Sequence, residues 1–395
     1  MNKIKLGIIG LGNMGSGHIR NICAGKCPRV EIAAICDLKE DRIEAMYAEI
    51  KKSYEDKNES TALPACFGDA IEMMDSGKID SVLIATPHYD HPVYVIEAIK
   101  RGIHVLSEKP AGVYTAKVRE AIEFSNEHPE TLYAMMFNQR TDPMYIKMHD
   151  IVSSGELGEL KRTSWIITNW YRPQTYYDSG NWRATWKGEG GGVLLNQCPH
   201  NLDLWQWICG MPVKIDAKLH YGKWHDIEVE DDVTAYVEYA NGATGTFITS
   251  TGDAPGTNRF EILGDKGKLV AEGNKLIFIK NEMPESEFRV TTKGAFSSPK
   301  TTYEEFVFEN RGPQHVGVLN AFADAIIDKT PLIANGAEGI NGLTISNAMH
   351  LSSWTGKEVT LPLDEDKFLE LLNERIAGSR FKNVDEKVSN TEGSY

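Results

Sequence analysis

Two segments of this chain carry side chains that could act on a hydroxyl group. Lys109 lies in His104-Val-Leu-Ser-Glu-Lys-Pro110, where an expected strand ends. A lysine there can orient a substrate hydroxyl through a charge-assisted hydrogen bond and favour alkoxide character. An unperturbed histidine has a pKa of about 6.5, so His200 is suited to take a proton while hydride leaves carbon. The structural alternatives are a Glu–Lys surface pair at a strand end and a packed, hydrogen-bonded histidine.

The residues around His200 are expected to lie on one helix. Three glycines (190–192) precede a pattern that predicts a helix over 193–209, closed by Gly210. Asn196, His200 and Asp203 would then share one face, at i, i+4 and i+7. A metal site on this face is disfavoured because asparagine is a poor zinc ligand.

A glycine-rich turn near the N-terminus predicts a dinucleotide site. The apolar segment 5–9 runs into the turn, and a helix pattern follows it. In such a turn the first glycine permits the bend, the second lets the backbone approach a pyrophosphate, and the third lets helix pack on strand. The helix N-terminus adds free N–H groups. The expected phosphate-binding residues are Gly10, Gly12, Asn13, Met14 and Gly15.

Asp37 follows the next expected strand, 31–36, about 20 residues beyond the turn. A carboxylate at this place accepts the hydroxyls of an adenosine ribose and repels a 2′-phosphate, which favours NAD over NADP. Lys39 and Arg42 could soften that preference. The alternative is a glycine turn in another kind of α/β unit, with Asp37 capping a helix.

The secondary-structure elements that must position these residues follow two different patterns along the chain. Strand and helix patterns alternate up to about residue 137, which predicts a parallel, doubly wound sheet. Consecutive strand patterns over 213–290 predict an antiparallel sheet. Helical patterns resume at 313–327 and 337–355. The expected domains are 1–137 for the dinucleotide, 138–363 for substrate and oligomerisation, and 364–395 as a charged extension, disordered at its end.

A long segment rich in aromatic residues lies between these regions. Rings interleaved with charged side chains fit sugar recognition, because apolar sugar faces stack on rings and hydroxyls need donors and acceptors. Alternatively they pack the domain interface, and we expect about half to be structural. So many large side chains favour a glycoside with an aryl or second sugar group. The expected substrate contacts are Lys109, Trp165, Tyr171, Arg172, Tyr177, Asp178, Trp182, Arg183, Asn196 and His200.

Composition excludes several classes of protein. The formal charge of −14 argues against nucleic-acid and anionic-membrane surfaces. The N-terminus enters a strand directly and the sequence has no apolar run of membrane-spanning length, so a cytoplasmic location is expected. No metal is expected, because the six cysteines are scattered and the group His88, Asp90 and His91 lacks a clean third ligand.

Four segments together resemble the Gfo/Idh/MocA oxidoreductase family: GIIGLGNMG, ATPHYDHP, HVLSEKP and GGGVLLNQCPHNLDLWQWICG. The similarity runs from Ile4 to about Pro362. It implies a Rossmann domain followed by an α/β domain with a large open, mainly antiparallel sheet. It also implies NAD or NADP as cofactor, and oxidation of a secondary alcohol of a sugar or cyclitol, or reduction of the ketone. It also implies that the open sheet joins subunits of a homo-oligomer, a dimer, tetramer or hexamer.

The resemblance also assigns roles to single residues. Lys109 matches the lysine that orients the reacting hydroxyl, and His200 matches the histidine that acts as general base during oxidation. Asn196 departs from the aspartate of many members, and an amide cannot remove a proton, so it could only position substrate. Further cofactor contacts are expected from Thr86, Pro87, His88, His91, Glu108 and Lys109.

The sequence therefore predicts an NAD-dependent oxidoreductase that acts on a ring hydroxyl of a sugar or glycoside. The resemblance favours the 3-hydroxyl, which would give a 3-keto product. One alternative is an inositol dehydrogenase. Another retains NAD tightly and uses transient oxidation to cleave a glycosidic bond. A non-catalytic dinucleotide sensor is disfavoured because Lys109 and His200 are both present.

Overall fold

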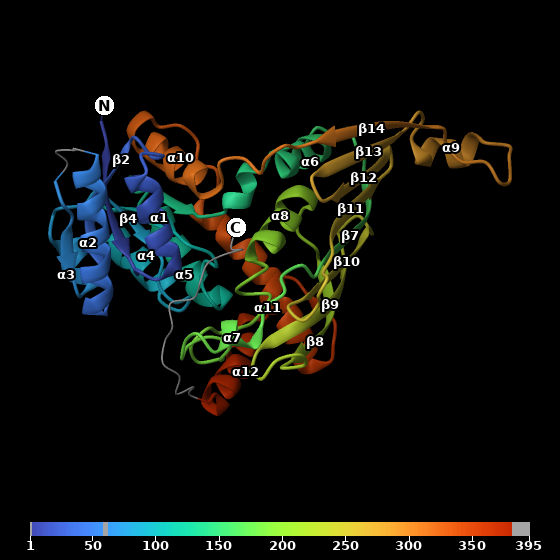
Figure 1. The fold of residues 1–395 in the computed structure, drawn as a ribbon. Helices are drawn as coiled ribbons and strands as arrows, with labels where there is room; N and C mark the ends of the chain where they lie inside the picture. The colour runs from blue at the N-terminus through green and yellow to red at the C-terminus, as the bar shows by residue number, and fades with distance from the viewer. Residues whose placement is uncertain (1, 58–61, 381–395) are drawn as a thin grey trace. The chain divides into compact units, whose positions relative to one another are not determined.

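The computed structural model describes residues 2–57 and 62–380. Within them the chain separates into two compact units (Figure 1). The first unit comprises the residues up to Arg140 together with Pro313–Leu343, and the second comprises Thr141–Gly312 together with the residues from Thr344. The expected disordered end of the chain lies outside the described residues.

The first unit is built on a six-stranded parallel sheet in the order β3-β2-β1-β4-β5-β6. The order reverses between β1 and β4, and open α/β sheets bind ligands at such a point, beyond the carboxyl ends of the strands. The Rossmann sheet expected from the sequence is confirmed. Its strands are β1 (Ile4–Ile9), β2 (Val30–Cys36), β3 (Ala65–Phe67), β4 (Ser81–Ile84), β5 (His104–Ser107) and β6 (Tyr133–Met135).

Helices cover both faces of this sheet. Right-handed crossovers place the helices that follow β1 and β2 on one face and those that follow β4 and β5 on the other. The contacts agree, since α1 packs on α2 and α10, and α4 packs on α5. Phe322 of α10 joins the core beneath α1 although it is distant in sequence. The helices are α1 (Asn13–Cys23), α2 (Glu40–Asp56), α3 (Ala70–Asp75), α4 (His91–Ile99), α5 (Thr115–Glu127) and α10 (Gln314–Asp328).

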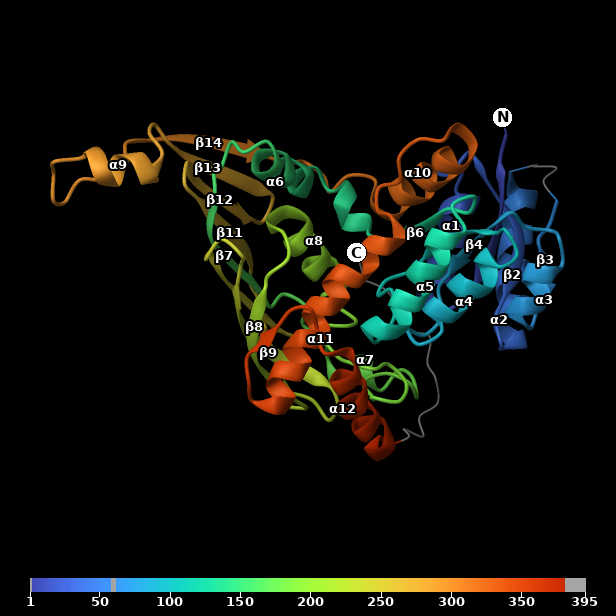
Figure 2. The same ribbon diagram turned by 180° about the vertical axis from the view of Figure 1, so that it is seen from behind.

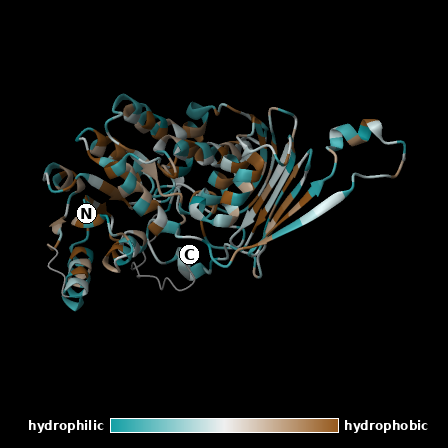
Figure 3. Ribbon diagram, turned by 90° about the horizontal axis from the view of Figure 1, so that it is seen from above, coloured by the Kyte–Doolittle hydropathy of each residue, from teal (hydrophilic) through white to brown (hydrophobic). Residues whose placement is uncertain are grey.

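The second unit holds a nine-stranded sheet in the order β14-β13-β12-β11-β7-β10-β9-β8-β15. Adjacent strands run antiparallel except β7 and β10, which are parallel, so the sheet is mixed but mostly antiparallel. Figure 3 shows hydrophobic residues along its strands. The strands are β7 (Leu160–Ile167), β8 (Lys214–Tyr221), β9 (Glu230–Glu238), β10 (Thr244–Ser250), β11 (Asn258–Gly264), β12 (Gly267–Glu272), β13 (Lys275–Asn281), β14 (Thr301–Val307) and β15 (Val359–Thr360).

Helices α6 and α8 pack against each other, and Figure 2 shows them along one face of this sheet, with α9 projecting beyond β13 and β14. Within the two described ranges, no helix combines the length and apolar character needed to cross a membrane. The remaining α-helices are α6 (Pro143–Ser153), α7 (Gln174–Tyr177), α8 (Pro199–Cys209), α9 (Glu285–Thr291), α11 (Gly339–Thr355) and α12 (Glu365–Gly378).

Candidate active site

The glycine turn has the shape that a pyrophosphate needs. Gly10 has a φ of +91°, and a Cβ there would lie 2.5 Å from the Ala85 carbonyl oxygen. A Cβ on Gly15 would lie 1.9 Å from the Gly10 oxygen, so close packing excludes any side chain. At Gly12 the Cβ position meets no atom of the described residues within 4 Å, and a side chain would fill that space. The space adjoins the N-terminus of α1, where free N–H groups favour an anion.

Asp37 fixes this turn from the end of β2. Its carboxylate accepts hydrogen bonds from the backbone N–H groups of Leu11 (2.8 Å) and Lys39 (2.9 Å). A carboxylate offers about four lone-pair sites, so Asp37 keeps capacity for ribose hydroxyls. These residues therefore fit a dinucleotide.

Lys109 follows strand β5, and its backbone is bonded to a buried ionic cluster of Glu108 and His18. The Glu108 carboxylate accepts hydrogen bonds from His18 Nε2 (2.7 Å) and from the Lys109 backbone N–H (3.2 Å). The His315 ring lies edge-on to His18 at 5.4 Å. Burial opposes ionisation of Glu108, but His18, His315 and Lys109 outweigh it and lower the pKa of Glu108 to about 2. The Glu108 side chain, expected to contact the cofactor, instead supports Lys109 from inside the unit.

His91 also has a different place from the one expected. Its ring is 1% exposed, with Nδ1 2.7 Å from the Pro110 carbonyl oxygen and Nε2 2.8 Å from that of Thr86. Both ring nitrogens face the backbone, so the expectation of a direct cofactor contact from His91 is wrong. The side chain joins the turn after β4 to the Glu-Lys-Pro segment. Thr86 and Pro87 remain partly or fully exposed, and His88 is buried.

In the second unit, α8 begins at Pro199 and not at residue 193. Proline lacks an N–H group and disfavours helical backbone in the residue before it, so it suits the first helical position. Asn196 therefore lies in the turn before α8 and does not share a helix face with His200 and Asp203. His200 is the second residue of the helix and is 8% exposed.

A short chain of polar contacts explains the amide at position 196. Asn196 Nδ2 donates to the Glu189 carboxylate, and Asn196 Oδ1 accepts from the Tyr176 hydroxyl (3.2 Å). The same hydroxyl accepts from Arg183 Nη1 at 2.9 Å. Glu189 is 2% exposed and also accepts the Ala184 N–H. An aspartate at 196 would face the Glu189 carboxylate, which explains why this position carries an amide. The sequence alone does not reveal this pairing.

Two of the expected substrate contacts are internal, and those expectations are wrong. Trp165 lies on the inward face of β7, is 0% exposed, and stacks on Phe260 at 4.2 Å. Tyr177 is 3% exposed, and its hydroxyl donates to Thr251. The candidates that keep exposed surface are Tyr171, Arg172, Asp178, Trp182 and Arg183.

The candidate residues thus fall into two groups. The glycine turn, Asp37, Thr86 and Lys109 belong to the first unit. Asn196, His200 and the aromatic segment belong to the second. Each group is organised by its own buried carboxylates.

Comparison with known families decides the class of protein. Residues 4–135 match the model of the oxidoreductase family with an NAD-binding Rossmann fold, and residues 145–270 match the GFO/IDH/MocA C-terminal domain. The chain belongs to the Gfo/Idh/MocA family of oxidoreductases. It therefore binds NAD(H) through its Rossmann domain.

Several relatives of this family member match most of its length. The oxidoreductase YrbE of Bacillus subtilis is 26% identical, with 91% of this chain and 97% of that protein covered. Myo-inositol 2-dehydrogenase of Thermotoga maritima is 23% identical, with 91% and 98% covered. The WlbA dehydrogenase of Bordetella pertussis, solved with NADH and UDP-GlcNAcA, superposes with a TM-score of 0.74 at 24% identity, covering 92% of this chain and 100% of that one.

Replacing Glu108 by glutamine should make the free energy of unfolding less dependent on pH in the acidic range. The folded pKa of about 2 lies below the ordinary value of about 4.3, so Glu108 stabilises the fold above that value and this contribution is lost as pH falls towards 2. The wild-type free energy of unfolding should fall more steeply than that of Glu108→Gln between pH 5 and pH 3, in denaturant titrations without cofactor. The control is Glu120→Gln, at an exposed position. Parallel curves for wild type and Glu108→Gln would contradict the ionised cluster.

Exchanging the amide and the carboxylate of the Glu189–Asn196 pair should show that they act together. Asn196→Asp alone sets a second carboxylate against the buried carboxylate of Glu189 and should cost roughly 1–3 kcal/mol of unfolding free energy. Glu189→Gln combined with Asn196→Asp restores one donor and one acceptor, and should recover at least half of that loss. The control is Asn169→Asp at an exposed position. Additive losses in the double variant would disprove the pairing.

Proposed function

We propose that this family member is an NAD-dependent oxidoreductase that interconverts a secondary ring hydroxyl of a sugar or glycoside and the ketone. The observation that carries the proposal is the contact chain from Arg183 through Tyr176 to Asn196. It ties a loop rich in rings and guanidinium groups to the segment that leads to His200. Rings and planar donors suit sugar faces and hydroxyls.

The chemistry divides between two side chains. NAD, when bound, supplies the hydride acceptor for the oxidation. Lys109 orients the hydroxyl and stabilises the negative charge that develops on its oxygen. His200 takes the hydroxyl proton during oxidation and returns a proton during reduction. Asn196, held by Glu189, positions the substrate and takes no proton.

Carboxylates around the ribose end favour NAD over NADP. A hollow of about 510 Å³ adjoins Asp37, and Glu40 and Glu44 also line it. Three carboxylates oppose a 2′-phosphate, whereas one guanidinium, that of Arg42, lies 3.6 Å from Asp37 and offsets them in part. We therefore expect NAD to be the working cofactor.

The class of substrate rests on the relatives and on the exposed side chains. The relatives include an inositol dehydrogenase, a sugar-nucleotide complex and a levoglucosan dehydrogenase. Tyr171 is 48% exposed, and Trp182 and Arg183 are partly exposed, which leaves room for a glycoside with a second large group. We favour oxidation at the 3-hydroxyl, on family resemblance.

We also infer a homo-oligomer formed through the nine-stranded sheet. Tyr236 of β9 is 41% exposed, and Tyr303 and Val307 of the edge strand β14 are 59% and 57% exposed. Large exposed side chains on a sheet are typical of a surface that another subunit covers. Sedimentation equilibrium of the purified chain should give a mass of two, four or six copies. A monomer at micromolar concentration would contradict the inference.

The first test of the function is reduced-nicotinamide fluorescence with NAD and a panel of sugars, inositols and glycosides. A continuous rise with a sugar or glycoside supports the dehydrogenase, and the best substrate identifies the class. A rise with inositols alone would replace the sugar proposal. A single burst equal to the enzyme concentration would indicate retained NAD and internal redox cycling. No signal in either direction, with NAD or NADH, would contradict the proposal.

Variants at the two reacting side chains test their roles. Lys109→Met and His200→Asn should each lower kcat by about 10²- to 10⁴-fold, because each removes a group that acts on the hydroxyl. NAD affinity, measured by calorimetry, should stay within about threefold in His200→Asn, because His200 lies outside the unit that holds the glycine turn. The matched controls are Lys100→Met and His220→Asn, at positions 48% and 55% exposed in their side chains. Full activity in His200→Asn would remove it as the base.

A further inference from the structure

Strand β9 begins with two consecutive acidic residues that are fully buried. Glu230 and Asp231 are each 0% exposed. Acidic residues are disfavoured in strands, and a buried carboxylate is costly unless hydrogen bonds compensate for lost water. The register with β8 pairs His220 with Asp232 and Tyr221 with Glu230, so it skips Asp231 and forms a bulge. Bulges recur beside active sites, where they redirect side chains.

Glu230 binds the segment that leads to His200. Its two carboxylate oxygens accept the backbone N–H groups of Gly192 (2.8 Å) and Leu194 (2.9 Å). Its carbonyl oxygen accepts the Val193 N–H at 3.0 Å, so one residue holds three consecutive amides. A Cβ on Gly192 would lie 2.0 Å from that carbonyl oxygen. Burial raises the pKa of Glu230 to about 8 while the amides oppose the rise, so these amides stabilise the carboxylate form.

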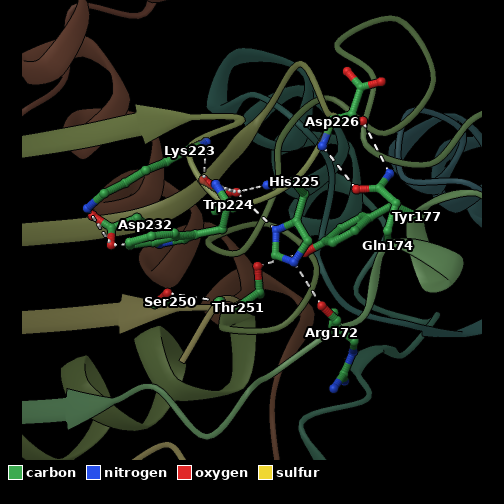
Figure 4. A network of polar contacts seen from close by, with 12 residues as sticks. Arg172, Gln174, Tyr177, Lys223, Trp224, His225, Asp226, Asp232, Ser250 and Thr251 are labelled. Carbon is green, nitrogen blue, oxygen red and sulfur yellow. Dashed lines mark hydrogen bonds and ion pairs between the residues drawn. The ribbon is translucent and has the colours of Figure 1, made fainter. Parts of the chain in front are cut away.

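Asp231 binds a different loop. Its carboxylate accepts the backbone N–H groups of Lys223 (3.0 Å), Trp224 (2.8 Å) and His225 (3.1 Å). His225 Nδ1 lies 3.0 Å from the same carboxylate, inside the network drawn in Figure 4. The turn 223–225 is thereby held on one side chain.

His225 extends this hold to the aromatic loop. Its Nε2 lies 2.8 Å from the Arg172 carbonyl oxygen, and its ring lies 4.9 Å from that of Tyr177. The Arg172 N–H donates to the Thr251 carbonyl, and the Thr251 N–H donates to the Asp231 carbonyl. Figure 4 shows a further link in which Gln174 bridges to Asp226. Asp231 therefore acts on the backbone at Arg172 by two routes.

We propose that Glu230 and Asp231 are positioning residues for two separate parts of the substrate site. Glu230 positions the segment that leads to Asn196 and His200. Asp231, through His225, positions the loop that carries Tyr171 and Arg172. This inference rests on the proposed function. Because the two carboxylates hold different loops, loss of Glu230 should affect turnover, and loss of Asp231 should affect substrate affinity.

Amide hydrogen exchange, measured above pH 8 so that Glu230 is ionised, tests both sets of hydrogen bonds without any need for turnover. In Glu230→Gln and Asp231→Asn an amide NH₂ faces backbone donors, so the affected N–H groups should exchange at least about tenfold faster. Glu230→Gln should expose 192–194 and leave 223–225 protected, and Asp231→Asn should do the reverse. The control is Asp232→Asn, the next residue of β9, which contacts side chains of Lys223 and Trp224. Equal exposure of both loops in either variant would overturn the proposal.

Kinetics with the best substrate of the wild type, above pH 8, separate positioning from general stability. We expect Glu230→Gln to lower kcat by at least about tenfold with KM within threefold. Asp231→Asn should raise KM by a similar factor with kcat retained. A parallel loss of both constants in both variants would overturn the assignment. If the wild type turns over no sugar, the proposed function fails while the exchange pattern still decides the two holds.

Two milder variants can test the proposal if Glu230→Gln or Asp231→Asn does not fold. His225→Gln leaves the amides of Lys223 and Trp224 on Asp231 and removes one of the two links to Arg172. Amide exchange should then become faster over 170–178 but not over 223–224. Unchanged exchange over 170–178 would overturn the proposal that Asp231 positions this loop through His225. Glu230→Asp keeps the charge but shortens the reach. Retained protection at 192 and 194 in this variant would overturn the Glu230 arm.

Discussion

Buried carboxylates that accept backbone N–H groups are the interaction on which both units depend. Asp37 holds the glycine turn at Leu11, and Glu108 holds the backbone of Lys109. Glu230 and Asp231 do the same for two loops of the second unit. A carboxylate is stable out of water only when hydrogen bonds compensate for its desolvation. Each loop is therefore fixed in the one conformation that satisfies its carboxylate.

Because of this constraint, the side chains that fix the loop backbones are different from the side chains that are left to contact a ligand. The carboxylates, and histidines such as His91 and His225, are buried and use their polar atoms on the backbone. The side chains left with exposed surface, such as Tyr171 and Arg183, stand on the loops that are held. Rigid loops carry their side chains without the entropy loss of ordering them during binding. The same division appears in both units, although their sheets differ.

Much of the fold could be predicted because its signals are local. Alternating strand and helix patterns indicated the parallel sheet, and the glycine spacing indicated the turn after β1. The start of α8 was placed too early because the apolar pattern continues upstream, whereas Pro199 decides the helix boundary. Strand β7 was missed because its one aromatic residue, Trp165, was assigned to a binding loop. Trp165 shows the reason: the same ring suits a sugar face or a sheet core.

By itself the sequence determined the features whose cause lies within a few residues. These are the turns that need glycine, the helices and strands that follow from apolar periodicity, and the start of α8 at Pro199. Only the tertiary structure decided which carboxylate serves which amide. Asp37 and Leu11 are 26 residues apart, and Glu230 and Gly192 are 38 apart. An acidic residue looks the same in sequence whether water or a distant backbone solvates it. Burial distinguishes the two, because it removes the water and leaves the amide as the partner.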